Sequence, residues 1–242
     1  MNINQLSKRL MAVAARIPAQ AVMADIGSDH AYLPCYAINK GLAVKAIAGE
    51  VADGPLQAAE QQVKAAGLEG EIDVRKGNGL EVISAGEVDC VTIAGMGGTL
   101  ITSILNEGKE KLEGVKRLVL QPNLRADHIR KWLIENDWEL IDEVIMEEDG
   151  KIYEILTAEK GDAEKPYSTR KELKLLTGPM LLAEKNEAFL KKWKREADQL
   201  EVVLKNLEKA GNQQAAKEKK QSVLRELQLI KEAISSEESE RT

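Results

Sequence analysis

The stretch AVMADIGSDHAYLP, residues 21–34, sets the fold class, because an apolar strand runs here through one glycine into a helical segment. A dinucleotide-binding turn would carry Gly-x-Gly-x-x-Gly at this place. Only Gly27 is present, with Asp29 at the second glycine position and Tyr32 at the third. The carboxylate would repel a phosphate, and the ring would keep it away from the backbone. The turn therefore predicts a ligand without phosphate.

The segments around this turn alternate between strand and helix patterns, which predicts an α/β, Rossmann-like and mostly parallel sheet with helices on both faces. The predicted strands are 21–26, 44–51, 71–75, 88–93 and 116–121, and the helices are about 30–40, 54–66, 98–107 and 125–136. Residues 138–159 then form two long strand patterns joined at Asp149-Gly150. Both turn residues tolerate positive φ, so we expect a hairpin and an antiparallel final strand.

The chain changes character near residues 158–170, a polar stretch that carries Pro166. Residues 1–160 hold 17 Lys/Arg and 25 Asp/Glu, a balance of −8, whereas residues 161–242 hold 17 and 15, a balance of +2; together they give the net charge of −6. We therefore expect a Rossmann-like domain over 1–162 and a C-terminal helical coiled-coil domain over 163–242.

The C-terminal part repeats apolar residues at steps of three and four on both sides of a Gly- and Asn-containing reversal at 209–214. This pattern predicts a short antiparallel helical hairpin whose seam is interrupted by Glu196. The seam residues are Phe189, Trp193, Leu200, Val203 and Leu207 on one side and Val223, Leu227, Ile230 and Ile234 on the other.

The N-terminus predicts an amphipathic helix. Within residues 1–18, Leu6, Leu10, Val13 and Ile17 have helical spacing, and no small-residue cleavage site follows an apolar block. This excludes a signal peptide. No apolar run approaches the roughly 20 residues that a membrane helix requires. We expect a cytoplasmic protein.

Cysteine and histidine are too few for a metal or disulfide framework. The two cysteines, Cys35 and Cys90, lie apart in apolar surroundings, and the chain has two histidines. Zinc and iron–sulfur sites need more ligands than this. We expect reduced, buried thiols and no metal.

Acidic residues at strand ends favour S-adenosylmethionine as the ligand, because this cofactor lacks phosphate and carries a sulfonium and an ammonium group. Asp25 and Asp29 stand at the first turn, and Glu50 follows at the end of the second strand, where an acid can accept from a ribose diol. Asn78 follows the third strand, where its amide can contact the adenine edge. The ligand is expected beyond the carboxyl ends of the strands, at the switch point near the first strand.

Six motifs carry a more specific resemblance. LSKRL (6–10), ADIGSDHAYLP (24–34), AGEV (48–51), GNGL (77–80), IAGMGG (93–98) and QPN (121–123), followed by a helical extension, resemble the bacterial tRNA (adenine-N1)-methyltransferases of the TrmK type, which belong to the class I S-adenosylmethionine-dependent methyltransferases. The resemblance covers the whole chain. It implies methylation of N1 of adenine 22 in tRNA, with S-adenosylhomocysteine as the cofactor product.

The resemblance also implies roles for single residues. Asp25, Gly27 and Asp29 match the positions beside the amino-acid end of the cofactor, Glu50 matches the ribose-binding acid, and Asn78 matches the residue beside the adenine. AGMGG, expected after the fourth strand, would provide Gly95 and Met96 as a backbone-rich wall around the methyl group.

The reaction asks little of the protein, because adenine N1 has a lone pair that can attack the methyl carbon without a general base. We therefore expect catalysis by alignment and by stabilisation of the developing cation. Asp29 is the first candidate for electrostatic help and Asn123 for base positioning, with His30 as a third candidate.

Contacts with tRNA are expected from two regions. Near the site, these are Arg9, Gln121 and Asn123; on the helical hairpin, they are Lys191, Lys192, Lys194 and Arg195. Lysines on the outside of a coiled coil commonly serve solvation alone. The basic balance of this part and the need for phosphate contacts favour a tRNA clamp. A monomer is expected, with a dimer left open.

Two other hypotheses stay open from the sequence. The net charge of −6 also fits a class I methyltransferase for another RNA, a protein or a small molecule. A binding module could use a degenerate Rossmann sheet and a coiled coil only to hold a partner. Cofactor affinity separates this module from an enzyme.

Overall fold

The computed structural model describes residues 5–209 and 214–235. The chain divides into two compact units, Met1–Pro166 and Tyr167–Thr242. The sequence pattern places the division four residues earlier, at 162/163. We describe each unit by itself.

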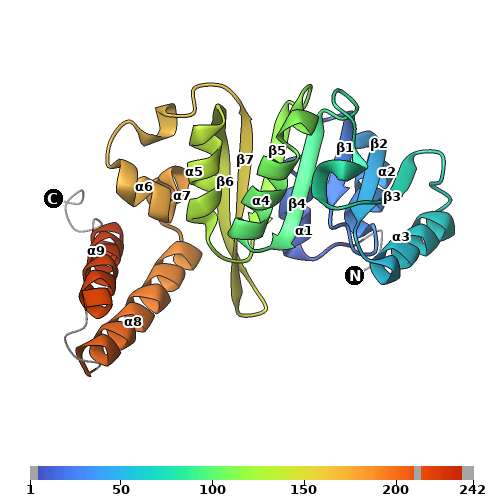
Figure 1. Ribbon diagram of the computed structural model, residues 1–242. Coiled ribbons are helices and arrows are strands. Elements are labelled where there is room, and N and C mark those ends of the chain that lie inside the picture. The colour runs from blue at the N-terminus through green and yellow to red at the C-terminus, as the bar shows by residue number, and fades with distance from the viewer. Residues whose placement is uncertain (1–4, 210–213, 236–242) are drawn as a thin grey trace. The chain divides into compact units, whose positions relative to one another are not determined.

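The first unit is built on a seven-stranded sheet with the order β3-β2-β1-β4-β5-β7-β6 (Figure 1). Neighbouring strands among the first five pair in parallel, whereas β7 pairs antiparallel with β5 and β6. The strands are β1 (Ala21–Ile26), β2 (Ala43–Glu50), β3 (Ile72–Lys76), β4 (Cys90–Met96), β5 (Arg117–Pro122), β6 (Trp138–Glu148) and β7 (Lys151–Lys160). The predicted mostly parallel sheet with an antiparallel final strand is confirmed.

The hairpin between β6 and β7 turns at the predicted residues. Asp149 has φ 50° and Gly150 has φ 76°. Two successive positive φ angles give a turn whose twist matches that of the strands. The last strand of the chain therefore enters the sheet between β5 and β6 instead of closing its edge.

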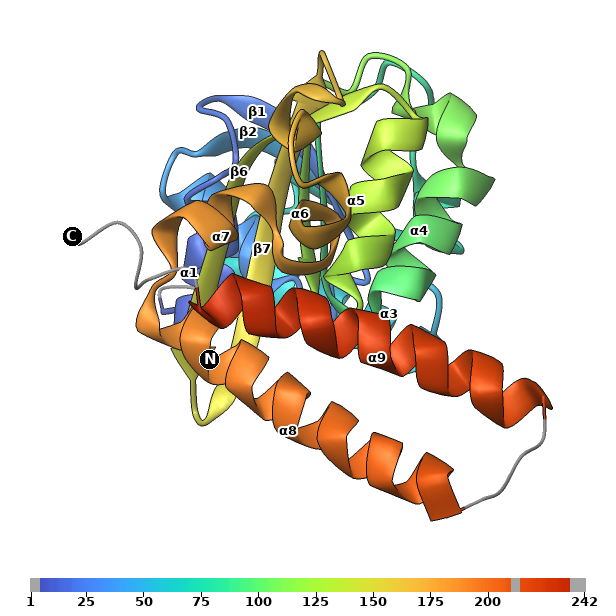
Figure 2. The same ribbon diagram turned by 90° about the vertical axis from the view of Figure 1, so that its left-hand side faces the viewer.

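Helices cover both faces of this sheet (Figures 1 and 2). One face carries α1 (Lys8–Ala14), α2 (Tyr32–Asn39) and α3 (Asp53–Ala66), and the other carries α4 (Gly98–Glu107) and α5 (Ala126–Glu135). Short 3-10 turns are η1 (Gly79–Val82), η2 (Lys109–Leu112) and η3 (Lys165–Tyr167).

The N-terminal helix is shorter than predicted. Ser7 caps α1, because its Oγ accepts from the Leu10 N–H at 3.2 Å, and the helix ends at Ala14. Pro18 disfavours helical backbone in the residue before it, which explains the early end. Leu6 and Ile17 lie outside the helix but are buried as expected.

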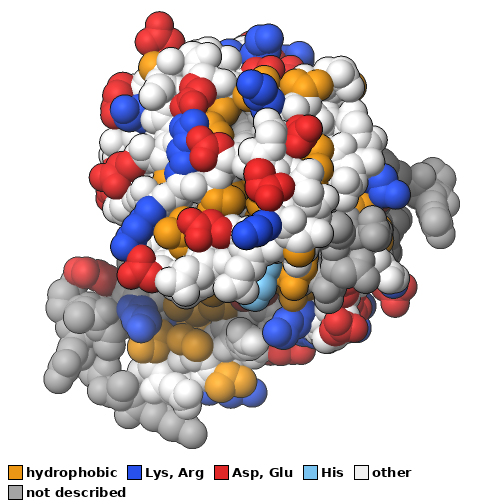
Figure 3. Space-filling view, turned by 90° about the vertical axis from the view of Figure 1, so that its right-hand side faces the viewer, with side chains coloured by type: hydrophobic (Ala, Val, Ile, Leu, Met, Phe, Trp, Pro, Cys, Tyr) orange, Lys and Arg blue, Asp and Glu red, His pale blue; other side chains and the backbone are white. Residues whose placement is uncertain are grey.

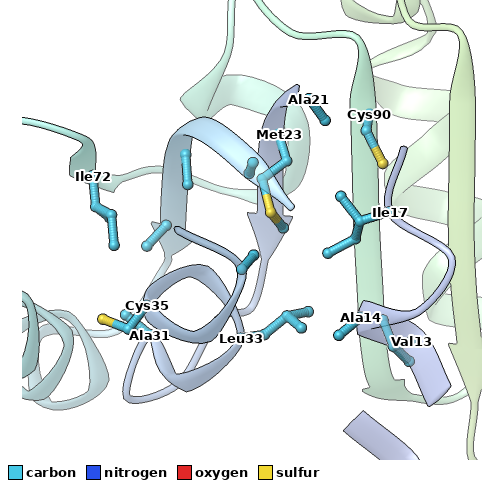
Figure 4. Packing of buried hydrophobic residues seen from close by; sticks show 14 of the residues in the cluster. Val13, Ala14, Ile17, Ala21, Met23, Ala31, Leu33, Cys35, Ile72 and Cys90 are labelled. Carbon is cyan, nitrogen blue, oxygen red and sulfur yellow. The ribbon is translucent and has the colours of Figure 1, made fainter. Parts of the chain in front are cut away.

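The core beneath α1 and α2 is assembled from small and branched side chains. Val13, Ala14 and Ile17 of the N-terminal segment face Leu33 and the first strands (Figure 4). Cys35 and Cys90 are fully buried, and burial raises the pKa of their thiols to about 11 and about 12. Both cysteines thus act as small apolar residues, as their apolar surroundings in the sequence predict.

The second unit is helical. It contains α6 (Lys171–Thr177), α7 (Pro179–Glu184), α8 (Glu187–Lys209) and α9 (Gln214–Ser235). The long helices α8 and α9 lie side by side (Figure 2), and Lys231 Nζ of α9 reaches Glu201 Oε1 of α8 at 2.8 Å. Residues 210–213 of the expected reversal lie outside the described residues.

The seam of α8 and α9 differs in detail from the expected one. Phe189, Trp193, Val223, Leu227 and Ile230 are buried as predicted. Ala197 is also buried beside the predicted interruption, and Leu200, Val203, Leu207 and Ile234 are only partly buried.

The surface charge and the hydropathy of the helices are relevant to what the protein can bind. On the face shown in Figure 3, acidic and basic side chains are interspersed among the described residues. In the part of the chain that the structure describes, no helix is both long and apolar enough to cross a membrane.

Candidate functional site

A cavity of about 300 Å³ opens at the carboxyl ends of β1 and β4. These strands are neighbours, and the order of the sheet reverses between them, so this is the switch point at which α/β sheets bind ligands. Six residues predicted from the sequence line the cavity: Arg9, Asp25, Gly27, Asp29, Gly95 and Met96.

Asp25 is the buried acid of this cavity, with 4% of its surface exposed. It lies opposite Thr92 in the parallel β1–β4 register. Its carboxylate accepts from Thr92 Oγ1 at 2.6 Å and from Ser28 Oγ at 2.7 Å. Burial raises the pKa of the Asp25 carboxyl, and the two hydrogen bonds partly oppose this increase. The carboxylate is therefore fixed in place and favours a cation beside it.

The turn after β1 is bound to the backbone of β2. The N–H groups of Gly27 and Ser28 donate to the Gly49 carbonyl at 3.0 and 3.2 Å. Gly27 has φ +70°, and a Cβ built on it would lie 2.2 Å from Met96 Cε. This turn thus needs glycine for two reasons, the backbone conformation and the space required by Met96.

Glu50 binds the same turn from the end of β2. Its Oε1 accepts from the backbone N–H of Asp29. Only 7% of Glu50 is exposed, and its pKa is raised by burial and by the charges of Asp29 and Asp25. Glu50 lies outside the cavity wall, but it places a third carboxylate at this edge of the sheet.

His30 stands before the helix instead of in its first turn. The helix α2 begins at Tyr32, after Ala31 in a left-handed conformation. His30 Nδ1 lies 2.8 Å from Asp29 Oδ1, and its ring stacks on Tyr32 with centroids 5.3 Å apart. His30 does not line the cavity; it contacts the candidate Asp29 from the solvent side.

A closed hydrogen-bond network lies beside the cavity. The buried Gln121 Oε1 accepts from Arg9 Nη1 and, at 3.0 Å, from the Gly95 N–H. Gln121 Nε2 donates to Asn123 Oδ1 at 3.3 Å, and Asn123 Nδ2 donates to the Gly95 carbonyl at 2.7 Å. Of this network, only Arg9 and Gly95 line the cavity, and Gln121 and Asn123 bind them from outside its wall.

The fourth strand extends farther than predicted and includes Gly95 and Met96. The pairing with β5 shifts between Ala94 and Met96, and Gly95 has φ +83°, which marks a bulge. Bulges turn the next side chain in a new direction, and here the Met96 side chain meets Gly27.

The remaining predicted residues are not in this cavity wall. Asn78 is exposed after β3, where its N–H donates to Glu81 Oε2 at 2.9 Å, and it lines a separate cavity of about 160 Å³. The four basic residues lie on α8 of the second unit, where Lys192 Nζ stands 4.6 Å from the ring centroid of Trp193. They are Lys191, Lys192, Lys194 and Arg195.

Sequence reasoning missed several residues that build the site. Ser28 and Thr92 hold Asp25, and Leu10, Leu33 and Ala94 complete the cavity wall. Ser28 lies inside the quoted turn, so an Asp-x-x-Ser spacing could have indicated it. Thr92 depends on strand register, which local patterns do not reveal.

Comparisons with known proteins agree with this geometry. A family model described as TrmK, tRNA (adenine(22)-N(1))-methyltransferase, matches residues 23–232. The chain is 52% identical over 235 residues to the tRNA (adenine(22)-N(1))-methyltransferase of Bacillus subtilis (strain 168), covering 97% of this chain and 99% of that protein.

Solved structures show the same likeness. The crystal structure of the B. subtilis M1A22 tRNA methyltransferase TrmK superposes with a TM-score of 0.93 at 51% identity, covering 96% of this chain and 100% of that chain. Streptococcus pneumoniae Sp1610, solved in complex with S-adenosyl-L-methionine, gives 0.84 at 41% identity over 95% of this chain and 100% of that chain. M. capricolum TrmK with S-adenosyl-homocysteine gives 0.79 at 27% identity over 95% and 97% of the two chains.

Proposed function

The chain belongs to the TrmK family of tRNA (adenine(22)-N(1))-methyltransferases, and from this premise we propose how its residues divide the work. The enzyme transfers the methyl group of S-adenosylmethionine to N1 of adenine 22 in tRNA. The sequence had left two alternatives open, a methyltransferase for another acceptor and a binding module without catalysis. Membership of this family favours neither of them.

The observation that supports the division of roles is the charge pattern of the 300 Å³ cavity, where Asp25 and Asp29 stand with the guanidinium of Arg9. The amino-acid end of the cofactor has an ammonium and a carboxylate, and its sulfonium adds a second positive charge. In our proposal the aspartates attract the cationic groups, and Arg9 binds the cofactor carboxylate. Glu50 accepts from the ribose diol, and Asn78 contacts the adenine.

This proposal moves Arg9 from tRNA binding to cofactor binding. Its guanidinium lines the cavity and is held by Gln121 and by the Tyr153 ring, whose centroid lies 5.3 Å from Arg9 Cζ. Methylation at N1 makes the adenine positively charged, so a cation at the target base would oppose the reaction. A cofactor carboxylate is the better partner.

The chemistry follows from alignment. The lone pair of adenine N1 forms the new N–C bond while the methyl–sulfur bond breaks and its electrons pass to sulfur. The chain's residues hold the two reactants in line and exclude water. Asp29 stabilises the positive charge that develops on the base.

Asn123 positions the base in this proposal. Its Nδ2 is fixed on the Gly95 carbonyl and its Oδ1 faces Gln121 Nε2. An amide oxygen has two lone pairs, so Oδ1 keeps one for the exocyclic amine of adenine. His30, beside the Asp29 carboxylate, positions that group and takes no proton in the transfer.

We assign phosphate contacts to the second unit, through Lys191, Lys192, Lys194 and Arg195, which lie on α8. Gln121 supports Asn123 from behind the cavity wall, through the hydrogen bond to its Oδ1. The enzyme acts as a cytoplasmic monomer in this proposal.

Methyl transfer from labelled cofactor to unmodified tRNA transcripts tests the activity of this chain. Digestion to nucleosides and mass analysis should show 1-methyladenosine, and its amount should fall to background when adenine 22 is replaced. Methylation that persists in the replaced transcript would contradict the site of modification.

The Arg9 assignment has a separate test. Arg9→Gln should weaken S-adenosylhomocysteine binding by about tenfold to a hundredfold, the range for removal of a charged hydrogen bond. Binding of 5′-methylthioadenosine, which lacks the amino-acid end, should change by less than about twofold by calorimetry. Lys8→Gln, an exposed cation one residue away on α1, is the control. Unchanged S-adenosylhomocysteine affinity with a raised KM for tRNA would return Arg9 to tRNA binding.

A further inference from the structure

Large apolar side chains are exposed at the carboxyl edge of the sheet. Among the described residues of the first unit, the three most exposed are Leu124 at 63%, Val51 at 61% and Leu100 at 52%. Single exposed apolar residues are ordinary on a protein surface. Here Val51 and Leu124 lie in loops that follow parallel strands, and Leu100 lies in the first turn of α4, directly after β4. Leu124 and Leu100 are next to the end of β4 that lines the cavity.

Leu124 is fixed in position by the backbone. The N–H of Asn123 donates to the Met96 carbonyl at 2.7 Å, and the N–H of Gly98 donates to the Leu124 carbonyl at 2.8 Å. A Cβ on Gly98 would lie 2.0 Å from the Arg125 carbonyl oxygen. The loop after β5 therefore sits directly on the connection between β4 and α4, without flexible side chains between them.

Gly97 lies next to Leu124 and offers it no side chain. A Cβ built on Gly97 would stand 4.0 Å from Leu124 Cδ1, in ordinary van der Waals contact. Since Gly97 has no such atom, the leucine has no side chain to pack against there. Leu100 follows two residues after Gly98 in the first turn of α4. Both leucines thus belong to one hydrogen-bonded junction of the β4–α4 and β5–α5 connections, beside Asn123.

The reaction requires the target adenine to be unpaired and unstacked, and the junction lies where it could help to achieve this. Adenine N1 is on the pairing edge of the base, so the base must leave its pair and its stack before it can reach the cavity. DNA-binding proteins insert apolar side chains between base steps and so hold these steps partly unstacked. A side chain with this task has to be apolar, exposed in the free protein and carried on a backbone that is held in place.

We propose that Leu100 and Leu124 form an apolar wedge that enters the tRNA stack where adenine 22 leaves it and so keeps the base in the cavity. The proposal rests on the family's tRNA activity, because the wedge adjoins the cavity in which that activity takes place. Its occupant is a nucleobase stack, and the wedge acts on the base-opening step without touching the cofactor.

Base opening can be measured with 2-aminopurine at position 22 of a tRNA transcript, since its fluorescence rises when the base leaves its stack. Addition of wild-type enzyme with S-adenosylhomocysteine should raise the fluorescence several-fold. The double variant Leu100→Ala, Leu124→Ala should lose most of this rise and should lower kcat on ordinary tRNA by about tenfold or more, because opening costs a few kcal/mol. Its affinity for S-adenosylhomocysteine should change by less than about twofold.

Two further variants serve as controls. Val44→Ala removes an apolar side chain that is 43% exposed at the start of β2, on the opposite edge of the sheet, and should leave the signal unchanged. Replacement of both leucines by Met should restore most of the fluorescence rise.

A full fluorescence rise in the double alanine variant would overturn the wedge. A wild-type dimer that the double variant loses in sedimentation, with base opening intact, would identify a second copy of the chain as the occupant and would equally overturn it. Wild-type activity on ordinary tRNA, measured alongside, separates failure of the wedge from failure of the proposed function.

Discussion

At the scale of the residue, the burial of Asp25 in the cofactor site lowers the folding stability of the protein when its carboxyl is ionised. Burial raises its pKa, so the folded protein binds this proton more tightly than the unfolded chain does. The stability that the proton contributes is gained as pH falls through the raised pKa and lost as pH rises. Ionisation of Asp25 therefore costs stability, and a cationic ligand beside the carboxylate offsets that cost.

Gly27 permits a matched comparison with Gly41. Both have left-handed φ, +70° and +68°, but only Gly27 faces the site, and a Cβ on Gly41 would meet nothing within 4 Å. Each change to Ala should lower the free energy of unfolding by about 1–2 kcal/mol in urea denaturation. Gly27→Ala should also reduce S-adenosylmethionine affinity at least about tenfold, because the added methyl group and the displaced Met96 side chain enter the cavity, whereas Gly41→Ala should retain it. Equal affinities in the two variants would show that the turn needs glycine for conformation alone.

Sequence reasoning located most of the cavity wall because its residues lie in short motifs next to predicted strand ends. Asp25 lies near the end of one strand, and Gly27 and Asp29 follow it directly, so their neighbourhood is set locally. The partners of Asp25 and the orientation of Asn123 depend on strand register and on the bulge at Gly95. These are tertiary properties that no local spacing contains.

At the scale of the element, α1 reaches the site through a carboxylate at the end of β6. The two oxygens of Glu148 accept from the backbone N–H of Lys8 at 2.6 Å and of Arg9 at 3.2 Å. A negative charge at a helix N-terminus stabilises the helix. Glu148 is thus a positioning residue that sets where Arg9 enters the cavity.

Glu148→Gln should destabilise the protein by about 0.5–1 kcal/mol through removal of this charge. If Arg9 binds the cofactor carboxylate, the same energy should weaken S-adenosylhomocysteine binding by about two- to fivefold and leave 5′-methylthioadenosine binding unchanged. Glu147→Gln is the control, since adjacent strand residues point to opposite faces. Equal weakening of both ligands by Glu148→Gln would indicate a general structural effect.

Turns with a strong local sequence signal were predicted correctly, whereas the ends of some helices and strands were not. The Asp149-Gly150 turn needs positive φ at both residues, which its sequence supplies. The three residues added at the end of β4 were missed because they depend on pairing with β5. The end of α1 was missed although Pro18 marks it in the sequence. Helical spacing continues in the sequence after the helix has ended.

At the scale of the whole molecule, the two parts of the chain carry charges of opposite sign, −8 over residues 1–160 and +2 over residues 161–242. A tRNA backbone would be repelled by the acidic part outside the pocket. Phosphate contacts are therefore expected in the second unit, where α8 carries four basic residues within five positions, 191–195.

The last prediction concerns this basic segment. Replacement of Lys191, Lys192, Lys194 and Arg195 by Gln should raise the KM for tRNA at least about tenfold and reduce the slope of log affinity against log salt by roughly one for each phosphate that is no longer neutralised. Cofactor affinity should stay the same. The control changes net charge equally by replacing Lys40, Lys45, Lys64 and Lys116, which are exposed on the first unit. If both sets change the salt slope alike, tRNA senses only net charge; if neither does, the phosphates are bound elsewhere. A change confined to the α8 set would show that the helical unit holds the tRNA while the Rossmann-like unit performs the transfer.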